Sequence, residues 1–346
     1  MEEGHTRERL KALQALPLDR KIGFTCARIT EWYNHYKGKV YVSFSGGKDS
    51  TVLLHIARTL FPDIKAMYVD TGLEYPEIKE FVKTFENVDI VRPKMTFTQV
   101  IDKFGYPVIG KEVAECIYDV RRSDGTNYAY RQQKLDGTLK DKNGNASRWN
   151  FKKYKYLLDA PFKISNKCCD IMKKNPANSY TAQTGLYPII ATMTEESYLR
   201  TSVWLRQGCN AFDATHPKSA PMSFWTEQDV LHYIKLKNIP IASVYGSIEG
   251  DSKRLHTTGC HRTGCVFCLF GIHQDKPQNR IQRLALTHPK LHNYCVNKLG
   301  LKYVMQYINE PYIPERNVYN TLLAQKYGST SYYNQITQQP KEGETK

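Results

Sequence analysis

A short apolar strand, a glycine-rich loop and a dense apolar helix follow one another near residue 45, and this order constrains the fold more than any other feature. The strand covers residues 39–44 (KVYVSF), the loop is SGGKDS, and the helix begins TVLLHIARTLF. Two further strands, IKAMYVDTG and VDIVRP, alternate with the helix PEIKEFVKTF. Strands that alternate with helices predict an α/β fold with a doubly wound parallel sheet.

The SGGKDS loop is predicted to bind phosphate. Gly46 and Gly47 allow backbone N–H groups to approach an anion, and the following helix N-terminus adds donors and a positive dipole. Lys48 supplies a full charge, while Ser45 and Ser50 supply hydroxyls. The alternative is an ordinary strand-to-helix turn in which a lysine occurs by chance. The position between a strand and a helix favours phosphate binding.

Composition narrows the range of partners and compartments. The 346 residues carry 49 Lys and Arg against 34 Asp and Glu, and the surplus of 15 positive charges favours an anionic partner. No apolar run reaches the ~18 residues of a membrane span, and the N-terminal residues do not resemble a secretory signal. We therefore expect no membrane partner and a cytoplasmic location, where clustered cysteines indicate metal binding or catalysis rather than disulfides.

Changes of pattern along the chain predict four segments. These are an N-terminal helical segment at 1–37, the α/β domain at 38–250, a cysteine-cluster and helical region at 251–326, and a flexible tail at 327–346. Within the α/β domain, residues 120–160 lose regular periodicity and are predicted to be a basic insertion whose DG and NG dipeptides mark turns and a candidate hairpin.

This insertion is rich in positive charge and aromatic rings. From Arg121 to Lys155 it holds ten Lys or Arg and three Asp. The interleaved rings are those of Tyr128, Tyr130, Trp149, Tyr154 and Tyr156. Such a stretch suits a nucleic-acid phosphate track with stacking rings, or alternatively a solvated insertion.

Two cysteine pairs form a candidate metal site. Cys168 and Cys169 are adjacent, and Cys265 and Cys268 form a C-x-x-C motif that Cys260 precedes. Four thiolates in two pairs suit a [4Fe–4S] cluster or a tetrahedral zinc ion, and adjacent cysteines are a poor fit to zinc. The remaining alternative is a set of buried thiols without a metal.

These motifs together resemble the PP-loop ATP pyrophosphatases, in the branch similar to phosphoadenosine phosphosulfate (PAPS) reductases. SGGKDS is similar to the family's loop, VDTGLEYPE to its second-strand motif, and TEES with Arg200 to its ExS-x-x-R motif. The resemblance implies a HUP-like fold that splits ATP, accompanied by Mg²⁺, between its α and β phosphates. It assigns the nucleotide to Ser45, Gly46, Gly47, Lys48, Asp49, Ser50, Asp70, Thr71, Gly72, Glu196, Ser197 and Arg200.

Lys48 and Asp49 are also candidates for catalysis under this resemblance. From the residues alone, two of the assignments keep an alternative. Asp70 could instead be a helix cap or turn residue, and Arg200 could form a salt bridge with Glu195 or Glu196.

The cysteine pattern resembles that of the iron–sulfur adenylyl-sulfate (APS) reductases. CCDIMK is similar to their CC-x-x-Arg-Lys element, with Met172 in place of the arginine, and RTGCVFC is similar to their second pair. The resemblance implies that a [4Fe–4S] cluster is held by Cys168, Cys169, Cys265 and Cys268. It also implies that Lys173 lies close to the cluster and belongs with the catalytic residues. Cys260 lies outside the pattern. Three roles remain open for it: a spare thiol, a replacement ligand or a catalytic persulfide carrier.

Two departures from the reductases favour a different activity. The sequence has no Glu-Cys-Gly-x-His element, which carries the reductase nucleophile, and its phosphate loop is intact, including Lys48. Both features favour an enzyme that adenylates a substrate with pyrophosphate release for sulfur transfer, as in DNA phosphorothioation or tRNA thiolation. The expected partners are then an adenine nucleotide, DNA or tRNA, and a cysteine desulfurase as sulfur donor. The alternatives are an APS or PAPS reductase, or a non-catalytic module that binds nucleotides or nucleic acid.

Overall fold

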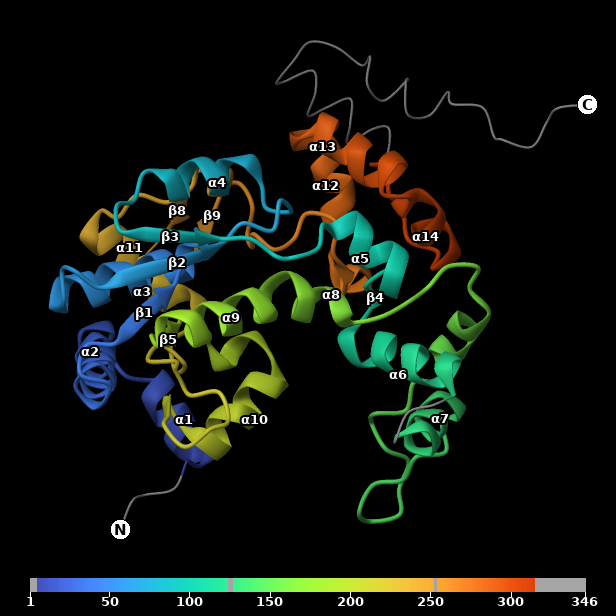
Figure 1. The fold of residues 1–346 in the computed structure, drawn as a ribbon, viewed down its shortest axis with the longest axis horizontal. Coiled ribbons are helices and arrows are strands. Elements are labelled where there is room, and N and C mark those ends of the chain that lie inside the picture. The colour runs from blue at the N-terminus through green and yellow to red at the C-terminus, as the bar shows by residue number, and fades with distance from the viewer. Residues whose placement is uncertain (1–4, 124–126, 252–253, 315–346) are drawn as a thin grey trace, which may run out of the picture. The chain divides into compact units, whose positions relative to one another are not determined.

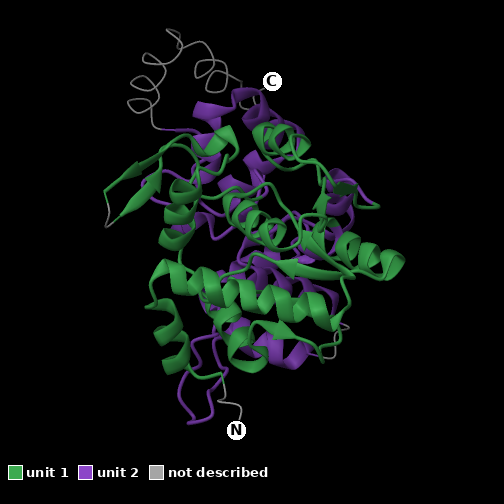
Figure 2. Cartoon of the chain, turned by 90° about the vertical axis from the view of Figure 1, so that its left-hand side faces the viewer, with its two compact units in different colours: residues 1–94, 172–264 green, residues 95–171, 265–346 purple. Residues whose placement is uncertain are grey.

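The computed structural model describes residues 5–123, 127–251 and 254–314. The chain forms two compact units, each built from two stretches of sequence (Figure 2). The first, here called the sheet unit, holds residues 1–94 and 172–264, and the second, here called the cysteine unit, holds residues 95–171 and 265–346.

This division differs from the predicted segments. The chain passes between units after residues 94, 171 and 264, whereas sequence pattern placed boundaries after 37 and 250. The basic stretch 120–160 belongs to the cysteine unit and is not an insertion in the sheet unit. Sequence order does not reveal such a division, because each unit closes its contacts between distant stretches of chain. The predicted tail at 327–346 lies outside the described residues.

A six-stranded sheet forms the centre of the sheet unit (Figure 1). Its order is β3 (Val88–Val91), β2 (Lys65–Val69), β1 (Val40–Ser43), β5 (Tyr187–Ile190), β7 (Lys218–Ser219) and β6 (Asn210–Ala211). All neighbours pair in parallel except β6 and β7, which are antiparallel. The predicted α/β fold with a mostly parallel sheet is thus confirmed. The chain runs from β1 outward to β3 and returns to β5, so the strand order reverses beside β1, where open α/β sheets bind ligands.

Alternating side chains bury this sheet on both faces. Val42 and Tyr68 point into the main core, which α2, α3 and α11 complete. Tyr41 and Met67 point to the opposite face, where the ring of Tyr180 on α9 lies 5.0 Å from that of Tyr41. The helices of this unit are α1 (Arg7–Gln14), α2 (Leu18–His35), α3 (Lys48–Leu60), α4 (Pro76–Lys83), α9 (Asn175–Thr184), α10 (Tyr198–Gln207) and α11 (Glu227–Lys237). Because helices cover both faces of a parallel sheet, its strands need apolar residues on both faces.

Helix α11 begins at a capping box. The Thr226 hydroxyl accepts a hydrogen bond from the Asp229 N–H at 3.3 Å, and the Asp229 carboxylate accepts one from the Thr226 N–H at 2.7 Å. Lys21 on α2 donates to the same carboxylate at 2.6 Å. These bonds fix the first turn of α11 and therefore position Glu227. The antiparallel strands β8 (Ile248–Gly250) and β9 (Leu255–Thr257) follow this helix along the chain.

The cysteine unit is mainly helical. Its two short strands, β4 (Val108–Ile109) and β10 (Leu269–Phe270), pair in parallel. Its helices are α5 (Phe97–Phe104), α6 (Lys111–Arg122), α7 (Tyr128–Asp136), α8 (Lys167–Cys169), α12 (Arg280–Thr287), α13 (Pro289–Asn293) and α14 (Leu301–Tyr307). No helix in the described ranges of either unit combines the length and apolar character that a membrane span requires.

The basic stretch is more regular than its sequence predicts. Helices α6 and α7 and a 3₁₀ helix at Lys152–Asp159 occupy much of it. The guanidinium of Arg121 holds the last of these in place, because it donates at 2.6–3.0 Å to the carbonyls of residues 157, 158, 160 and 162. The predicted turn at Asn143-Gly144 is present inside an antiparallel bridge between Lys140 and Ala146, and the Asp141 carboxylate stabilises it. The turn predicted at residues 124–125 lies outside the described residues.

Candidate active site

The phosphate loop connects β1 to α3 and is held by its own hydroxyls. Helix α3 begins at Lys48 with Gly47 as its N-cap residue, three residues before the predicted start at Thr51, so Lys48, Asp49 and Ser50 belong to its first turn. The Ser45 N–H donates to Ser50 Oγ at 3.1 Å, and the two hydroxyl oxygens lie 3.0 Å apart. Ser50 Oγ also donates to the Gly47 carbonyl at 2.9 Å. The loop is therefore preorganised around the donors that an anion requires.

Gly46 is the residue of this loop that tolerates a side chain least. Its φ of +70° lies in the left-handed region, and an added Cβ would lie 2.8 Å from Cγ2 atoms of both Ile78 and Val82 on α4. We predict that Gly46→Ala lowers the free energy of unfolding by about 2–4 kcal/mol, since strain and overpacking add. Urea denaturation measures the loss. Gly72→Ala is the control, because Gly72 has a φ of +73° but open space at its Cβ. Equal losses in the two variants would contradict the tight packing of Gly46.

Lys48 is buried and paired, not exposed at the tip of the loop. Its side chain is 4% exposed, and Nζ lies 3.2 Å from Asp49 Oδ1 and 3.1 Å from Glu227 Oε1. Burial by itself lowers the pKa of Lys48, but the charges of Asp49 and Glu227 outweigh it and hold that pKa above its ordinary value. The ammonium therefore stays charged in a site with little water, where its attraction for an anion is strong.

A cavity of about 460 Å³ lies beside Lys48, entirely within the sheet unit. We call it the large cavity. Its walls come from the phosphate loop, from the residues after β5, from the start of α11 and from residues 262–264. Four acidic side chains (Asp49, Glu195, Glu196, Glu227) and three basic ones (Lys48, Arg200, Arg262) line it. The predicted phosphate loop thus borders a space that contains several charges of both signs.

Among the lining residues that the sequence did not predict are Glu227, Tyr245, Arg262 and Thr263. The Tyr245 hydroxyl accepts a hydrogen bond from the Lys48 N–H at 3.1 Å and bonds to Thr263 Oγ1 at 2.6 Å. The capping box at Thr226 could have drawn attention to Glu227, and Arg262 and Thr263 directly precede the C-x-x-C motif. Neither signal indicates that these residues lie beside the phosphate loop, because they are about 200 positions away from it in sequence.

A second, smaller cavity of about 140 Å³ adjoins the large one and also belongs to the sheet unit alone. The two share Ser43, Ser45, Thr263 and Gly264. The small cavity lies where β1 and β2 end, and its other lining residues are Phe44, Tyr68, Val69, Glu74, Tyr75, Ile78, Lys173 and Ala177. Six of the twelve lining residues are apolar or aromatic, and Lys173, predicted to be catalytic, is among the polar ones.

The predicted residues Asp70, Thr71 and Gly72 line neither cavity. The Asp70 carboxylate instead accepts hydrogen bonds from Lys79 at 2.9 Å and Arg92 at 3.3 Å. Burial alone would raise the pKa of Asp70, but Lys79 and then Arg92 hold it below its ordinary value. The Thr71 hydroxyl donates to Glu74 Oε1 at 2.6 Å. This turn therefore orients Glu74, which does line the small cavity.

The ExS-x-x-R residues divide between lining and structural roles. Glu196 and Arg200 line the large cavity and form an ion pair with each other, which is the alternative that the sequence left open. Ser197 is the N-cap of α10, where its hydroxyl accepts from the Arg200 N–H at 3.3 Å, and it does not line the cavity. Cys260 lines neither cavity, and its N–H donates to the Val244 carbonyl at 2.8 Å.

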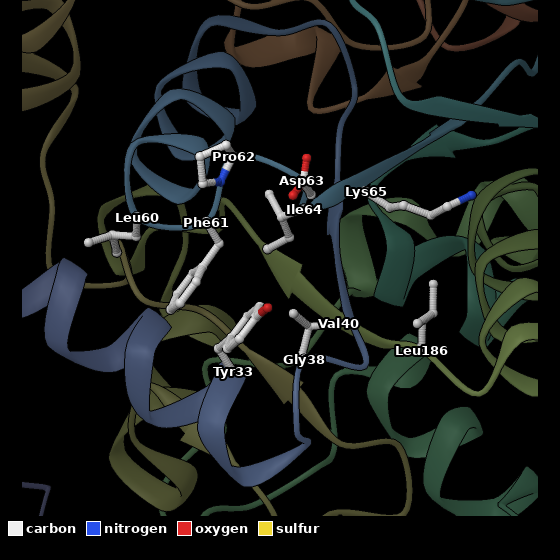
Figure 3. A pocket seen from close by; sticks show the side chains of 10 residues that line it. All are labelled: Tyr33, Gly38, Val40, Leu60, Phe61, Pro62, Asp63, Ile64, Lys65 and Leu186. Atoms are coloured by element: carbon white, nitrogen blue, oxygen red, sulfur yellow. The ribbon is translucent and has the colours of Figure 1, made fainter.

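A further cavity of about 260 Å³ lies at the opposite ends of the strands (Figure 3). The rings of Tyr33 and Phe61 stack on one wall with centroids 3.6 Å apart. Val40 and Lys65, which also line it, begin β1 and β2. Ligands of open α/β sheets bind beyond the carboxyl ends of the strands, so we assign this cavity no part in the site.

All four predicted metal-binding cysteines belong to the cysteine unit, where Cys169, Cys265 and Cys268 lie close enough to act on the Cys168 thiol. Cys168 and Cys169 end the short helix α8, which α5 contacts. Cys265 and Cys268 close a turn in which the Cys268 N–H donates to the Cys265 carbonyl at 3.0 Å. Inside this turn Phe267 packs on Phe97 of α5, with ring centroids 3.6 Å apart. Helix α5 therefore supports both pairs.

The thiols of the two pairs influence one another. Hydrogen bonding to Cys169 and burial raise the pKa of the Cys168 thiol, and the charges of Cys169, Cys268 and Cys265 raise it further. In the described part of the chain, no group of three or more His, Cys, Asp or Glu side chains is arranged to hold a metal ion. Four cysteine sulfurs are nevertheless the donor set of an iron–sulfur cluster. The donors fit the predicted cluster, which remains a prediction.

Comparison with known proteins identifies relatives of this arrangement. The model of the phosphoadenosine phosphosulfate reductase domain family matches residues 39–108 and 111–269. An adenosine 5'-phosphosulfate reductase of Bacillus thuringiensis is 21% identical over 245 residues, which make up 70% of this chain and 79% of that protein. A solved phosphoadenylyl-sulfate reductase of Candida auris, in complex with phosphate, is 14% identical with a TM-score of 0.36 and matches 73% of this chain and 99% of its own.

A shorter match links the chain to two uncharacterised proteins of Methanocaldococcus jannaschii. Each is 36% identical, over 87 and 91 residues, which make up 23% and 25% of this chain. The matches span only 21% and 18% of those proteins, about a fifth of their length. The family model, by contrast, covers well over half of this chain, from the strand before the phosphate loop to the strand after the second cysteine pair. The chain therefore belongs to the phosphoadenosine phosphosulfate reductase domain family.

Proposed function

We propose that this protein binds ATP with Mg²⁺ and cleaves it between the α and β phosphates, adenylating a substrate and releasing pyrophosphate. The observation that carries the proposal is the intact phosphate loop, whose buried Lys48 lines the large cavity at the N-terminus of α3. A charged ammonium beside a helix N-terminus suits the terminal phosphates of a nucleotide.

The chemical step follows from this placement. A substrate oxygen attacks the α phosphorus, the bond to the bridging oxygen breaks, and pyrophosphate departs with the electron pair. Negative charge develops on the departing phosphates, where Lys48 and the N–H groups of α3 stabilise it. Arg200 and Arg262, which line the same cavity, add positive charge around the transferred group.

The balance of charge in the large cavity supports a role for Mg²⁺. The four acidic lining residues exceed the three basic ones, so the cavity by itself does not offset the charge of a triphosphate. Carboxylates are ligands that Mg²⁺ prefers, and the ion commonly bridges one or two carboxylates and substrate phosphates. Asp49 and Glu227, which contact Lys48, are the carboxylates that we propose for this role.

The small cavity would take the base of the nucleotide. Its walls combine apolar and aromatic side chains with several polar groups, a composition that suits a flat heteroaromatic ring. The small cavity shares Ser43 and Ser45 with the large cavity. One nucleotide would therefore place its base in the small cavity and its phosphates in the large one.

Sulfur transfer is the reaction that we propose to follow adenylation. Cys168, Cys169, Cys265 and Cys268 would hold a [4Fe–4S] cluster, which supplies redox-active iron when it is bound. A cysteine desulfurase would supply the sulfur as a persulfide, with Cys260 as the candidate carrier. The outer persulfide sulfur would attack the adenylated atom and expel AMP, which leaves the substrate joined to Cys260 by a disulfide. A thiol reductant would then supply two electrons that cleave this S–S bond, so the substrate keeps the sulfur and Cys260 returns to a thiol.

Calorimetric titration under anaerobic conditions tests the nucleotide proposal. We expect ATP to bind in the presence of Mg²⁺ and to bind far more weakly in EDTA, because the carboxylates of the large cavity then repel it. Tight binding of APS or PAPS without affinity for ATP would instead support a sulfonucleotide reductase. That second candidate rests on the match to an adenosine 5'-phosphosulfate reductase over 70% of the chain.

We also propose DNA or tRNA as the partner of the basic stretch in the cysteine unit. Within the fold, Arg121 donates to carbonyls, Arg131, Lys134 and Lys155 pair with carboxylates, and Arg122 donates to the Tyr118 hydroxyl at 2.7 Å. Arg122, Lys152 and Lys153 are exposed, as are the rings of Tyr128 and Tyr130. Exposed cations with nearby rings are the features that a phosphate backbone and its bases require.

Replacing Arg122, Lys152 and Lys153 by alanine is predicted to reduce the affinity for nucleic acid. Each lost phosphate contact should lower the slope of log affinity against log salt by up to ~0.9, because fewer counterions are released. Titration of both polymers at two salt concentrations measures the slope. The control replaces Lys39, Lys235 and Lys237 by alanine. These lysines are exposed on the sheet unit, and replacing them removes the same number of positive charges. Equal slopes in both variants would reject this surface as the binding site.

A further inference from the structure

A cavity that the proposed function leaves unused adjoins the large cavity on the side of β7. It has a volume of about 250 Å³ and belongs to the sheet unit alone. Residues that follow β5, one face of α10 and residues of β6 and β7 line it, and we call it the β7 cavity. The β7 cavity and the large cavity share Ile190, Thr192, Met193 and Arg200, so the two spaces adjoin at these residues.

The β7 cavity differs from the large cavity in charge. Four acidic side chains line the large cavity, whereas the charged residues of the described chain that line the β7 cavity, Arg200 and Lys218, are both basic. Arg200 is paired with Glu196. Lys218 is half-buried and has no ion pair or side-chain hydrogen bond in the described ranges. An ammonium without a protein partner attracts an anion, and here no lining carboxylate opposes it.

Much of the remaining lining of the β7 cavity is apolar. It includes Ile190, Met193, Val203 and Trp204, and Leu199, which is 60% exposed, extends this lining toward solvent. The volume of about 250 Å³ exceeds the 140 Å³ of the small cavity, to which we assign the base of ATP. The β7 cavity therefore suits a ligand that combines a flat apolar body, somewhat larger than a base, with one anionic group.

We propose that the β7 cavity binds a nucleotide unit of the substrate that is adenylated, with its base in the apolar part and its phosphate on Lys218. Lys218 lines the β7 cavity but not the large one, whereas Arg200 lines both. A base held between these two residues would face the triphosphate with the edge that lies away from its own phosphate. The Arg200 guanidinium would donate to a carbonyl oxygen on that edge.

The base would be one that carries an N–H beside a carbonyl group, as uracil does. Its carbonyl oxygen would attack the α phosphorus, pyrophosphate would leave with the electron pair, and the proton of the adjacent ring nitrogen would pass to water. This role of the β7 cavity rests on the proposed function, because it requires ATP in the large cavity.

A base reaches a cavity of this kind only when it is neither paired nor stacked in a duplex. A free nucleotide and an unpaired nucleotide in DNA or RNA present the same chemistry to Lys218 and Arg200. We expect nucleic acid to be the source, since DNA or tRNA is the partner that we propose for the basic stretch. The affinities of a mononucleotide and of oligonucleotides separate the two sources.

Uridine 5'-monophosphate (UMP) is the probe of the β7 cavity. Its binding would be measured by calorimetry with Mg²⁺ and saturating α,β-methylene ATP, which occupies the nucleotide site and cannot be cleaved between those phosphates. We expect UMP to bind the parent, and Lys218→Met to weaken this binding about tenfold, because a charge-assisted contact is lost. The affinity for α,β-methylene ATP should not change.

Matched variants separate a specific effect from a general one. Lys39→Met removes an exposed lysine at the amino end of β1, which lines neither cavity, and should not affect UMP. Leu199→Glu places a carboxylate in the lining of the β7 cavity and should prevent UMP binding. Leu236→Glu makes the same change at a leucine of α11 that is 65% exposed and lines neither cavity, and it should bind UMP as the parent does.

Oligonucleotides identify the source of the nucleotide unit. We expect a single-stranded oligouridylate to bind more tightly than UMP, to lose affinity in Lys218→Met, and to bind less tightly once it is paired in a duplex. Tighter binding of UMP than of the oligouridylate would support the β7 cavity as a site for a free nucleotide and reject nucleic acid as the source.

Three results would reject the β7 cavity as the acceptor site. UMP would fail to bind, would compete with α,β-methylene ATP, or would bind Lys218→Met and Leu199→Glu as tightly as the parent. In each case binding of α,β-methylene ATP by the parent would leave the nucleotide site of the proposed function intact. A parent that did not bind α,β-methylene ATP would overturn the proposed function together with the acceptor site.

Discussion

Replacing Lys48 by methionine is expected to weaken the binding of ATP about 100-fold and to abolish pyrophosphate release. The change removes the charged group but keeps most of the volume of a side chain that is only 4% exposed. A charge-assisted hydrogen bond is worth about 1.5–3 kcal/mol, and the low dielectric of the site adds to this. Titration of ATP and of tripolyphosphate should show the same loss, because Lys48 acts on the phosphates.

The same change should also reduce stability, because Asp49 and Glu227 lose the ammonium between them. The position of the loop in the sequence predicts an exposed lysine whose removal costs little, and the structure shows that this expectation is wrong. We expect a loss of about 1–3 kcal/mol in the free energy of unfolding. Adding Glu227→Gln to Lys48→Met should restore part of that stability without restoring affinity for ATP. Full affinity for ATP in Lys48→Met would reject the assignment of the loop.

Loss of one cysteine from the four should abolish the cluster. We expect the parent, purified without oxygen, to contain about four iron and four sulfide per chain, and Cys268→Ser to contain almost none. A cluster held by four thiolates has no spare protein ligand, and Cys268 belongs to the set that acts on Cys168. Iron and sulfide analysis measures the outcome.

Cys209→Ser is the matched control for this experiment. Cys209 is half-buried in the sheet unit, where its Sγ lies 3.2 Å from Ser223 Oγ, and it should not affect the iron content. Stoichiometric zinc without iron in the parent would contradict the cluster and support a zinc site. Equal iron loss in Cys209→Ser and Cys268→Ser would show that the loss reflects general damage.

Short sequence patterns predicted the strand, the loop and the helices that depend on interactions between neighbouring residues. The short apolar run at residues 39–44 predicts a strand, and SGGKDS after it predicts a loop that leads into a helix. The capping box at Thr226 places the start of α11 to the residue. Each of these features is determined by side chains within a few positions of one another.

The parts that could not be predicted depend on distant segments. The burial of Lys48 requires Glu227, and the hydrogen bond of its N–H requires Tyr245. Arg121 lies in the predicted phosphate track, but its guanidinium donates to four carbonyls that are 36 to 41 residues further along the chain. The division into two units is also invisible in the sequence, because the chain crosses between them three times.

The products of ATP test the central claim most directly. The cluster-loaded protein would be incubated anaerobically with Mg²⁺, ATP, a persulfide donor and either DNA or tRNA, and the nucleotides and phosphates would be separated and measured. We predict AMP and pyrophosphate in equal amounts, with neither product formed by Lys48→Met. Formation of ADP and phosphate, or of sulfite from APS or PAPS while ATP stays intact, would contradict cleavage between the α and β phosphates.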